Sequence, residues 1–239
     1  MAWLLEIEDA DGTDLYPAIK EKAFAKLAEA DAGKSDCYDL VRYEYIRRFG
    51  YYCTESSEHN AEYNNLFIKS KYPELIDRFN IPLDEYPRRC IKQIENWEAR
   101  RDKLLSGETL EHKRSVEYAS YIMEAMVTSK PYQIGGNVLN NGCIPNLPSN
   151  ACVEVPCLVD GYGIHPCRVG ALPVQCAAMN MTNINVQLLT IEAAVTRKKE
   201  HIYQAAMMDP HTGAELSTDE IVAMCNDLIE AHTAAGFPI

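Results

Sequence analysis

The cysteine, histidine and carboxylate residues of this sequence do not by themselves form a complete catalytic or metal-binding motif. The nine cysteines contain no Cys-x-x-Cys pair, so neither a zinc ribbon nor a thioredoxin-like redox site is predicted. His59 is flanked by the carboxylates Glu58 and Glu62. A lone histidine needs partners to become a metal site, so by itself it is more often a hydrogen-bonded structural residue. The two glutamates could orient the imidazole or could be solvated helix carboxylates.

A phosphate-binding loop is also missing from the 239 residues. Neither the GxGxxG pattern of dinucleotide-binding folds nor the GxxxxGK[ST] pattern of nucleotide triphosphatases occurs. Such loops bind phosphate through backbone amides at the start of a helix. The sequence therefore predicts no nucleotide-binding unit within these residues.

The overall charge narrows the possible partners. The chain carries 23 Lys and Arg against 35 Asp and Glu, a net charge of −12. An acidic surface repels phosphate backbones and anionic lipid, so neither nucleic acid nor a membrane is an expected partner. No apolar run approaches the length of a membrane span, and the first nine residues lack the basic region of a signal peptide. A cytoplasmic protein with mostly reduced, buried cysteines is expected.

Helices outnumber strands in the pattern of apolar residues, which predicts an α+β fold. A Ser217-Thr218-Asp219-Glu220 capping box should open the last helix. Glycine and proline are concentrated in residues 131–176, which indicates strands and loops there. Helices are predicted over 15–30, 38–49, 84–105, 115–128 and most of 177–232, and strands over 2–8 and 152–159.

Short segments spread in order along nearly the whole chain carry a family resemblance. They include Met1-Ala2-Trp3, Asp14-Leu15-Tyr16-Pro17, Gly50-Tyr51-Tyr52, Thr54-Glu55-Ser56-Ser57-Glu58-His59, Arg114-Ser115-Val116-Glu117-Tyr118-Ala119, Gly136-Asn137-Val138 and Thr182-Asn183-Ile184-Asn185-Val186-Gln187. Each segment is weak alone, but the ordered set is specific. Together they resemble the bacterial α-galactosidases of glycoside hydrolase family 4.

The resemblance implies that residues 1–239 form one domain, the C-terminal substrate- and metal-binding half of such an enzyme. Its expected fold is mostly helical with a small mixed or antiparallel sheet, like the C-terminal domain of lactate and malate dehydrogenases. In the family, an NAD-binding Rossmann domain comes first and ends in a Cys-x-x-Asn-His segment directly before Met-Ala-Trp. Here Met1 begins at that point, so the Rossmann domain and its metal-binding cysteine are expected to be missing, through a truncated gene or an internal start codon.

The resemblance also implies a redox route of glycoside cleavage, an exception to the scheme of two carboxylates. NAD oxidises the sugar 3-hydroxyl, and a divalent metal, usually manganese, polarises the resulting ketone. A base then removes the C2 proton and the aglycone leaves. NAD and Mn²⁺ are therefore the expected cofactors of the complete enzyme, and the chain alone is expected to be inactive.

Site residues follow from matching the family segments. His59 is the implied metal ligand. Tyr118 is the predicted base and Tyr121 its rival, because a phenol with a pKa near ~10 needs nearby positive charge to act as a base. Arg114, one turn before Tyr118 on the predicted helix, would supply that charge. Tyr121 would instead group with Glu117 and Glu124, which favours Tyr118.

Asn137 and Asn140 are the predicted substrate-binding residues. Their amides suit sugar hydroxyls, although plain turn formation by asparagine is nearly as good an explanation. The expected partners are an α-galactoside, the Rossmann half and further copies of the chain in a homo-oligomer. A non-catalytic interaction module, or one half of a split glycosidase, remains the alternative. The substrate half of a dehydrogenase is set aside, since a Gly-x-His-Gly motif is not found.

Overall fold

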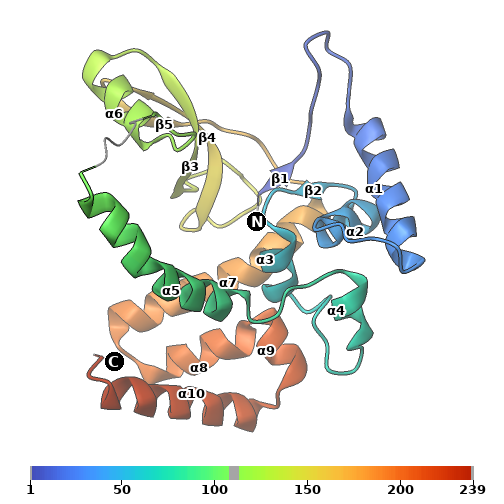
Figure 1. The fold of residues 1–239 in the computed structure, drawn as a ribbon, viewed down its shortest axis with the longest axis vertical. Helices are drawn as coiled ribbons and strands as arrows, with labels where there is room; N and C mark the ends of the chain where they lie inside the picture. The colour runs from blue at the N-terminus through green and yellow to red at the C-terminus, as the bar shows by residue number, and fades with distance from the viewer. Residues whose placement is uncertain (1, 108–112, 238–239) are drawn as a thin grey trace. The chain divides into compact units, whose positions relative to one another are not determined.

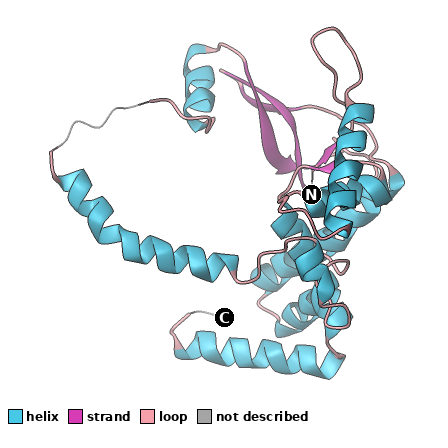
Figure 2. Cartoon of the chain, turned by 45° about the vertical axis from the view of Figure 1, so that its right-hand side comes forward, coloured by secondary structure: helices cyan, strands magenta, loops and turns pink. Residues whose placement is uncertain are grey.

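The computed structural model describes residues 2–107 and 113–237, which fall into two compact units. Unit 1 comprises residues 1–81, 137–154 and 168–239, and unit 2 comprises residues 82–136 and 155–167. Helices dominate the secondary structure, and the strands form small sheets (Figures 1 and 2). The predicted α+β class, mostly helical with a small antiparallel sheet, is confirmed.

Most of the helices belong to unit 1. They are α1 (Tyr16–Asp31), α2 (Leu40–Phe49), α3 (Ser57–Glu62), α4 (Glu74–Arg78), α7 (Val174–Thr196), α8 (Lys199–Met208), α9 (Pro210–Glu215) and α10 (Thr218–Ala234). Its strands β1 (Trp3–Leu4) and β2 (Tyr52–Cys53) pair antiparallel. Unit 2 contains α5 (Glu85–Leu105), α6 (Ala119–Thr128) and β5 (Gly163–Pro166). The strands β3 (Tyr132–Leu139) and β4 (Cys152–Asp160) are divided between the two units.

The core of unit 1 forms where α1 and α2 pack together. Leu27 from α1 and Leu40, Val41 and Tyr45 from α2 are almost fully buried in one apolar cluster. The Tyr45 ring contacts Phe67 with a centroid separation of 5.7 Å. A second layer is made by α7, α8 and α10, each packed on the next (Figure 1). This core fixes the strand β2 and the start of α3, which carry the candidate site.

Local signals near the chain's helix ends were well predicted. Ser217 accepts the amide of Glu220, and the Glu220 carboxylate accepts the amide of Ser217, so the capping box is confirmed. Gly50 ends α2 with a φ of 86°, a left-handed conformation that glycine adopts without strain. Among the described residues, no helix is both long and apolar enough to cross a membrane.

Two predicted elements are shorter than their patterns indicated. The strand predicted over 2–8 is reduced to Trp3–Leu4, because its antiparallel partner β2 is itself two residues long. The helix predicted over 115–128 begins at Ala119. The Ser115 hydroxyl accepts the backbone amide of Glu117, which gives the segment before α6 a local alternative to helical hydrogen bonding.

The larger sheet has the strand order β3-β4-β5, with β4 and β5 antiparallel and Leu158 opposite His165. Buried and exposed residues alternate along β4, as expected for a sheet with one covered face. The strands approach closely at Gly136. A Cβ atom there would lie 2.7 Å from the Cys157 sulfur, so the backbone position admits only glycine without a shift.

Candidate functional site

A buried polar network holds the start of α3. Asn60 is completely buried, and its side-chain nitrogen donates to the carbonyl oxygens of Glu55 (2.8 Å) and Ser56 (3.0 Å). The Cys53 thiol donates to the Asn60 side-chain oxygen at 3.2 Å. The Ser56 hydroxyl caps the helix by accepting the amide of His59 at 3.2 Å. These bonds fix the backbone on which His59 stands.

The His59 ring is oriented by a carboxylate one turn before it. Its Nδ1 lies 3.2 Å from Oε1 of Glu55, and its ring stacks on Tyr63 with a centroid separation of 5.7 Å. A carboxylate at Nδ1 favours the proton on that nitrogen and leaves the lone pair on Nε2 for a ligand. Glu55 was given no role from the sequence, although its i,i+4 spacing to His59 is a signal that could have identified it.

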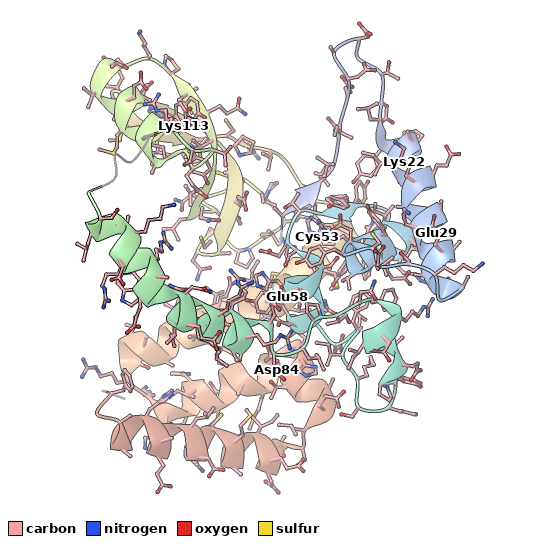
Figure 3. The ribbon with its side chains drawn as sticks, viewed as in Figure 1. Lys22, Glu29, Cys53, Glu58, Asp84 and Lys113 are labelled. Atoms are coloured by element: carbon pink, nitrogen blue, oxygen red, sulfur yellow. The ribbon has the colours of Figure 1, made fainter. Side chains whose placement is uncertain are left out.

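Three potential metal ligands converge on α3. Glu58, His59 and Glu62 each offer a ligand atom, and these atoms lie within 4.8 Å of one another. Figure 3 labels Glu58 on this helix and Cys53 on the preceding strand. At about 100° per residue, positions 58, 59 and 62 fall within about 100° around the helix axis, so the three side chains share one side of the helix. Two carboxylate oxygens and one imidazole nitrogen suit a divalent cation such as Mn²⁺.

The electrostatics of the trio favour a cation. Partial burial raises the pKa of the Glu62 carboxyl, and the neighbouring Glu58 carboxylate raises it further. Glu55 differs, since the backbone amide of Ser56 lowers the pKa of its carboxyl and the His59 ring adds to the effect. Glu55 is thus held as the anionic partner of the imidazole, while Glu58 and Glu62 repel each other. A divalent cation between them would remove that repulsion.

The two candidate tyrosines lie in unit 2. Tyr118 precedes the first residue of α6, and its hydroxyl donates to the backbone carbonyl of Gly135 at 2.9 Å. The Tyr121 ring stacks on Tyr132, with centroids 4.9 Å apart and an interplanar angle of 12°. Tyr118 is exposed and Tyr121 is half-buried, so neither is a core residue.

The electrostatic argument for Tyr118 was wrong. Because α6 begins at Ala119, Arg114 and Tyr118 do not share a helical stripe. The Arg114 guanidinium instead lies 4.1 Å from the centroid of the Tyr121 ring and forms an ion pair with Glu124 at 2.6 Å. The positive charge therefore accompanies Tyr121, and the Glu124 carboxylate that was expected to disfavour Tyr121 is paired. The choice of base stays a prediction.

The two predicted substrate-binding asparagines have different surroundings. Asn137 lies on the exposed side of β3 rather than in a turn, because alternate residues of this strand face outward. Asn140 is fully buried and donates to the carbonyl oxygens of Ile144, Leu147 and Pro148, while its oxygen accepts the Ile144 amide at 2.7 Å. These are the contacts of a residue that holds a turn, the alternative that the sequence left open for it. Asn137 is free to contact a ligand.

A cavity of about 480 Å³ lies elsewhere in unit 1. Its lining includes Glu6, Glu8, Tyr16, Tyr51 and Gln175, and none of the α3 trio. The candidate metal site is therefore identified by its donor atoms and does not coincide with this cavity.

Comparison with protein families gives one match over most of the chain. Residues 1–212 match the family model described as the Family 4 glycosyl hydrolase C-terminal domain. An α-galactosidase of Bacillus subtilis (strain 168) is 61% identical over 232 residues, which is 97% of this chain and 52% of the relative. An α-galactosidase of Rhizobium meliloti (strain 1021) is 34% identical over 81% of this chain and 41% of the relative.

Solved structures show the same fold at low sequence identity. The crystal structure of lplD from Bacillus subtilis aligns with a TM-score of 0.79 at 19% identity, over 94% of this chain and 52% of that one. A 6-phospho-α-glucosidase from gut microorganisms, crystallised with NAD and Mn²⁺, aligns with a TM-score of 0.65 at 18% identity, over 97% of this chain and 53% of that one. The chain thus spans about half the length of the relatives it matches.

Proposed function

The chain belongs to the family 4 glycosyl hydrolases, and from this premise we propose that it is the metal- and substrate-binding half of an α-galactosidase. The observation that carries the proposal is the α3 trio with its oriented imidazole. The two α-galactosidases that resemble the chain at 61% and 34% identity support the choice of sugar. Relatives named for phosphorylated sugars are more distant, at 25% identity for maltose-6'-phosphate glucosidase of Bacillus subtilis.

His59 would hold the divalent metal through Nε2, with Glu58 and Glu62 as oxygen donors beside it. When bound, such a metal polarises a substrate oxygen and stabilises negative charge that develops on it. Glu55 orients the imidazole, and the Asn60 network keeps the helix start in place. The donors of this chain fit the Mn²⁺ found with a structural neighbour.

A tyrosine of this chain would remove the C2 proton of the sugar. Tyr118 is proposed on the family resemblance, and Tyr121 is its rival on electrostatics, because the Arg114 cation lies over the Tyr121 ring. Asn137, on the exposed side of β3, would contact sugar hydroxyls. NAD would bind to the half of the enzyme that the relatives have in addition to the region matched here.

Activity should therefore require both halves. We would join the chain to the N-terminal half of the Bacillus subtilis relative and measure hydrolysis of a chromogenic α-galactoside. NAD, Mn²⁺ and a reductant should all be needed, and the 6-phosphorylated α-glucoside should be a poor substrate. The unjoined chain should bind no NAD in isothermal titration. Hydrolysis in chelator without NAD would show that the assignment of the reaction is wrong.

Variants of the joined enzyme separate the proposed roles. Tyr118→Phe should abolish exchange of the C2 proton while Mn²⁺ and NAD still bind, and Tyr121→Phe should retain exchange. The opposite pattern would move the role of base to Tyr121. Neither tyrosine is one of the three proposed metal ligands, so metal binding serves as an internal control in each variant.

A further inference from the structure

A second cavity of unit 1 combines an aromatic floor with a charged rim. It has a volume of about 330 Å³ and lies between α2 and the segment 66–79, which contains α4 (Figure 1). The ring centroid of Tyr45 lies 5.4 Å from that of Phe49 and 5.7 Å from that of Phe67, and Phe67 meets Phe79 edge to face at 5.1 Å. A floor of this kind favours a ligand with an aromatic ring, which can add further edge-to-face contacts.

The volume of the cavity limits the ligand to a small molecule. Ligand-binding cavities usually measure about 300–1,000 Å³, so this one is at the lower end. One water takes about 30 Å³ in the liquid, and the cavity therefore has the volume of about eleven waters. This space accommodates a single aromatic ring with a short side chain.

Two arginines stand at the rim beside the aromatic floor. The guanidinium of Arg78 lies 5.1 Å from the centroid of the Phe79 ring and pairs with the Asp31 carboxylate at 2.7 Å. Arg48 also lines the cavity, and its Nε lies 2.9 Å from Oε1 of Glu44. These contacts hold both cations where a ligand on the floor would meet them.

The ion pairs behind the rim lack one anion. Arg47 pairs with both Asp31, at 3.5 Å, and Glu44, so three arginines share two carboxylates and leave a local charge of +1 (3 − 2). The Nε of Arg47 is buried and has no hydrogen-bond partner among the described residues. The Glu44 side chain is only 12% exposed and has two arginine partners, so it repels an incoming anion weakly.

We propose that this cavity binds a small aromatic carboxylate. Its ring would lie on the floor formed by Phe49, Phe67 and Phe79, and its carboxylate would lie between Arg48 and Arg78. Guanidinium groups bind carboxylates through strong, charge-assisted hydrogen bonds, which favours an acid over a neutral or cationic ligand of the same shape. The site does not rest on the proposed hydrolase function, because none of the α3 trio lines the cavity.

Three ligands of one shape and different charge test the proposal with the full chain. Isothermal titration at pH 7 would compare 3-phenylpropionate with its neutral amide and with 3-phenylpropylamine, which is cationic. The acid should bind with a Kd of about 0.1–1 mM, as expected for a ligand of this size. The amide should bind about tenfold more weakly or worse, because it does not neutralise the excess charge, and the amine should show no saturable binding.

A double variant tests the recognition of charge. Arg48→Gln with Arg78→Gln should weaken binding of the acid by about tenfold or more and leave binding of the amide unchanged. Asp31 and Glu44 both keep Arg47 as a partner, so neither carboxylate is left unpaired. Lys22→Gln with Lys26→Gln is the control, since it removes the same charge from exposed positions of α1 and should leave the acid affinity within about twofold.

A second variant tests the place of binding by filling the cavity. Leu66 lines the cavity and is 39% exposed, so Leu66→Trp should block the entrance and abolish binding of both acid and amide. Leu216 is similarly exposed, at 36%, and lies outside the lining, so Leu216→Trp should bind like the unchanged chain. All of these variants should keep their circular dichroism and thermal midpoint, because the altered side chains are largely exposed.

Four outcomes would overturn the proposal. The first is no saturable binding of the acid up to about 10 mM. The second is equal affinity for acid and amide, which would leave the arginines without a role. The third is binding that Leu66→Trp leaves intact, which would place the ligand elsewhere. The fourth is loss of binding when the chain is joined to the N-terminal half of the Bacillus subtilis relative, since that half would then be the occupant of the cavity.

Discussion

The Asn60→Ala substitution tests how the candidate metal site is held in place. The Asn60 side chain is completely buried and makes three hydrogen bonds, to the carbonyls of Glu55 and Ser56 and from the thiol of Cys53. Alanine removes all three. It leaves the Glu55 carbonyl without this donor and opens a small void behind α3.

The magnitude follows from these contacts. Each net hydrogen bond contributes about 1 kcal/mol, and a buried group left unsatisfied costs about 1–3 kcal/mol. The free energy of unfolding should therefore fall by about 3–5 kcal/mol. For a chain of this length, about 2–4 °C of midpoint corresponds to 1 kcal/mol, so the thermal midpoint should fall by roughly 10 °C. Affinity for Mn²⁺ should fall as well, because the start of α3 positions His59.

Urea unfolding followed by circular dichroism measures the stability, and electron paramagnetic resonance of free Mn²⁺ measures the affinity. Asn65→Ala is the matched control, since Asn65 is exposed five residues further along, and its effect should stay within about 0.5 kcal/mol. If Asn60→Ala costs less than about 1 kcal/mol, or no more than Asn65→Ala, the network does not hold the site and the reasoning fails.

Three further predictions follow from single contacts. His59→Ala should weaken Mn²⁺ binding by about tenfold or more, and Glu55→Gln should weaken it by about tenfold. His201→Ala, on α8, should leave the affinity unchanged. Equal affinities in the three variants would show that Mn²⁺ does not bind at α3. Gly136→Ala should lower the free energy of unfolding by about 1–3 kcal/mol, because the new Cβ meets the Cys157 sulfur at 2.7 Å, and adding Cys157→Ala should restore part of the loss. At pH 8 a thiol reagent should label the exposed Cys152 quickly and Cys176 slowly, because burial raises the pKa of the Cys176 thiol to about 11. Mass spectrometry measures the two labelling rates, and equal rates would contradict the burial of Cys176.

The sequence by itself determined the family, the α+β class and most helix positions. Helix periodicity is a local property, and caps such as Ser217 with Glu220 or Gly50 after α2 depend on residues within one turn. The ordered family segments likewise placed His59 in a metal-binding context by resemblance alone. The family match over residues 1–212 confirms that prediction of membership.

Tertiary structure decided what the sequence could only offer as alternatives. Whether Asn140 grips a ligand or holds a turn depends on which carbonyls its amide reaches, and three of them belong to residues 144–148. Likewise, Arg114 was assigned to Tyr118 by helical spacing, yet its cation lies over Tyr121 because the helix begins later than its pattern indicated. Glu55 is a partner of His59 because the chain between them turns so that Oε1 of Glu55 lies 3.2 Å from Nδ1 of His59. Even contacts between residues close in sequence depend on where a helix begins and how a turn folds, and the residue pattern alone indicates these only as alternatives.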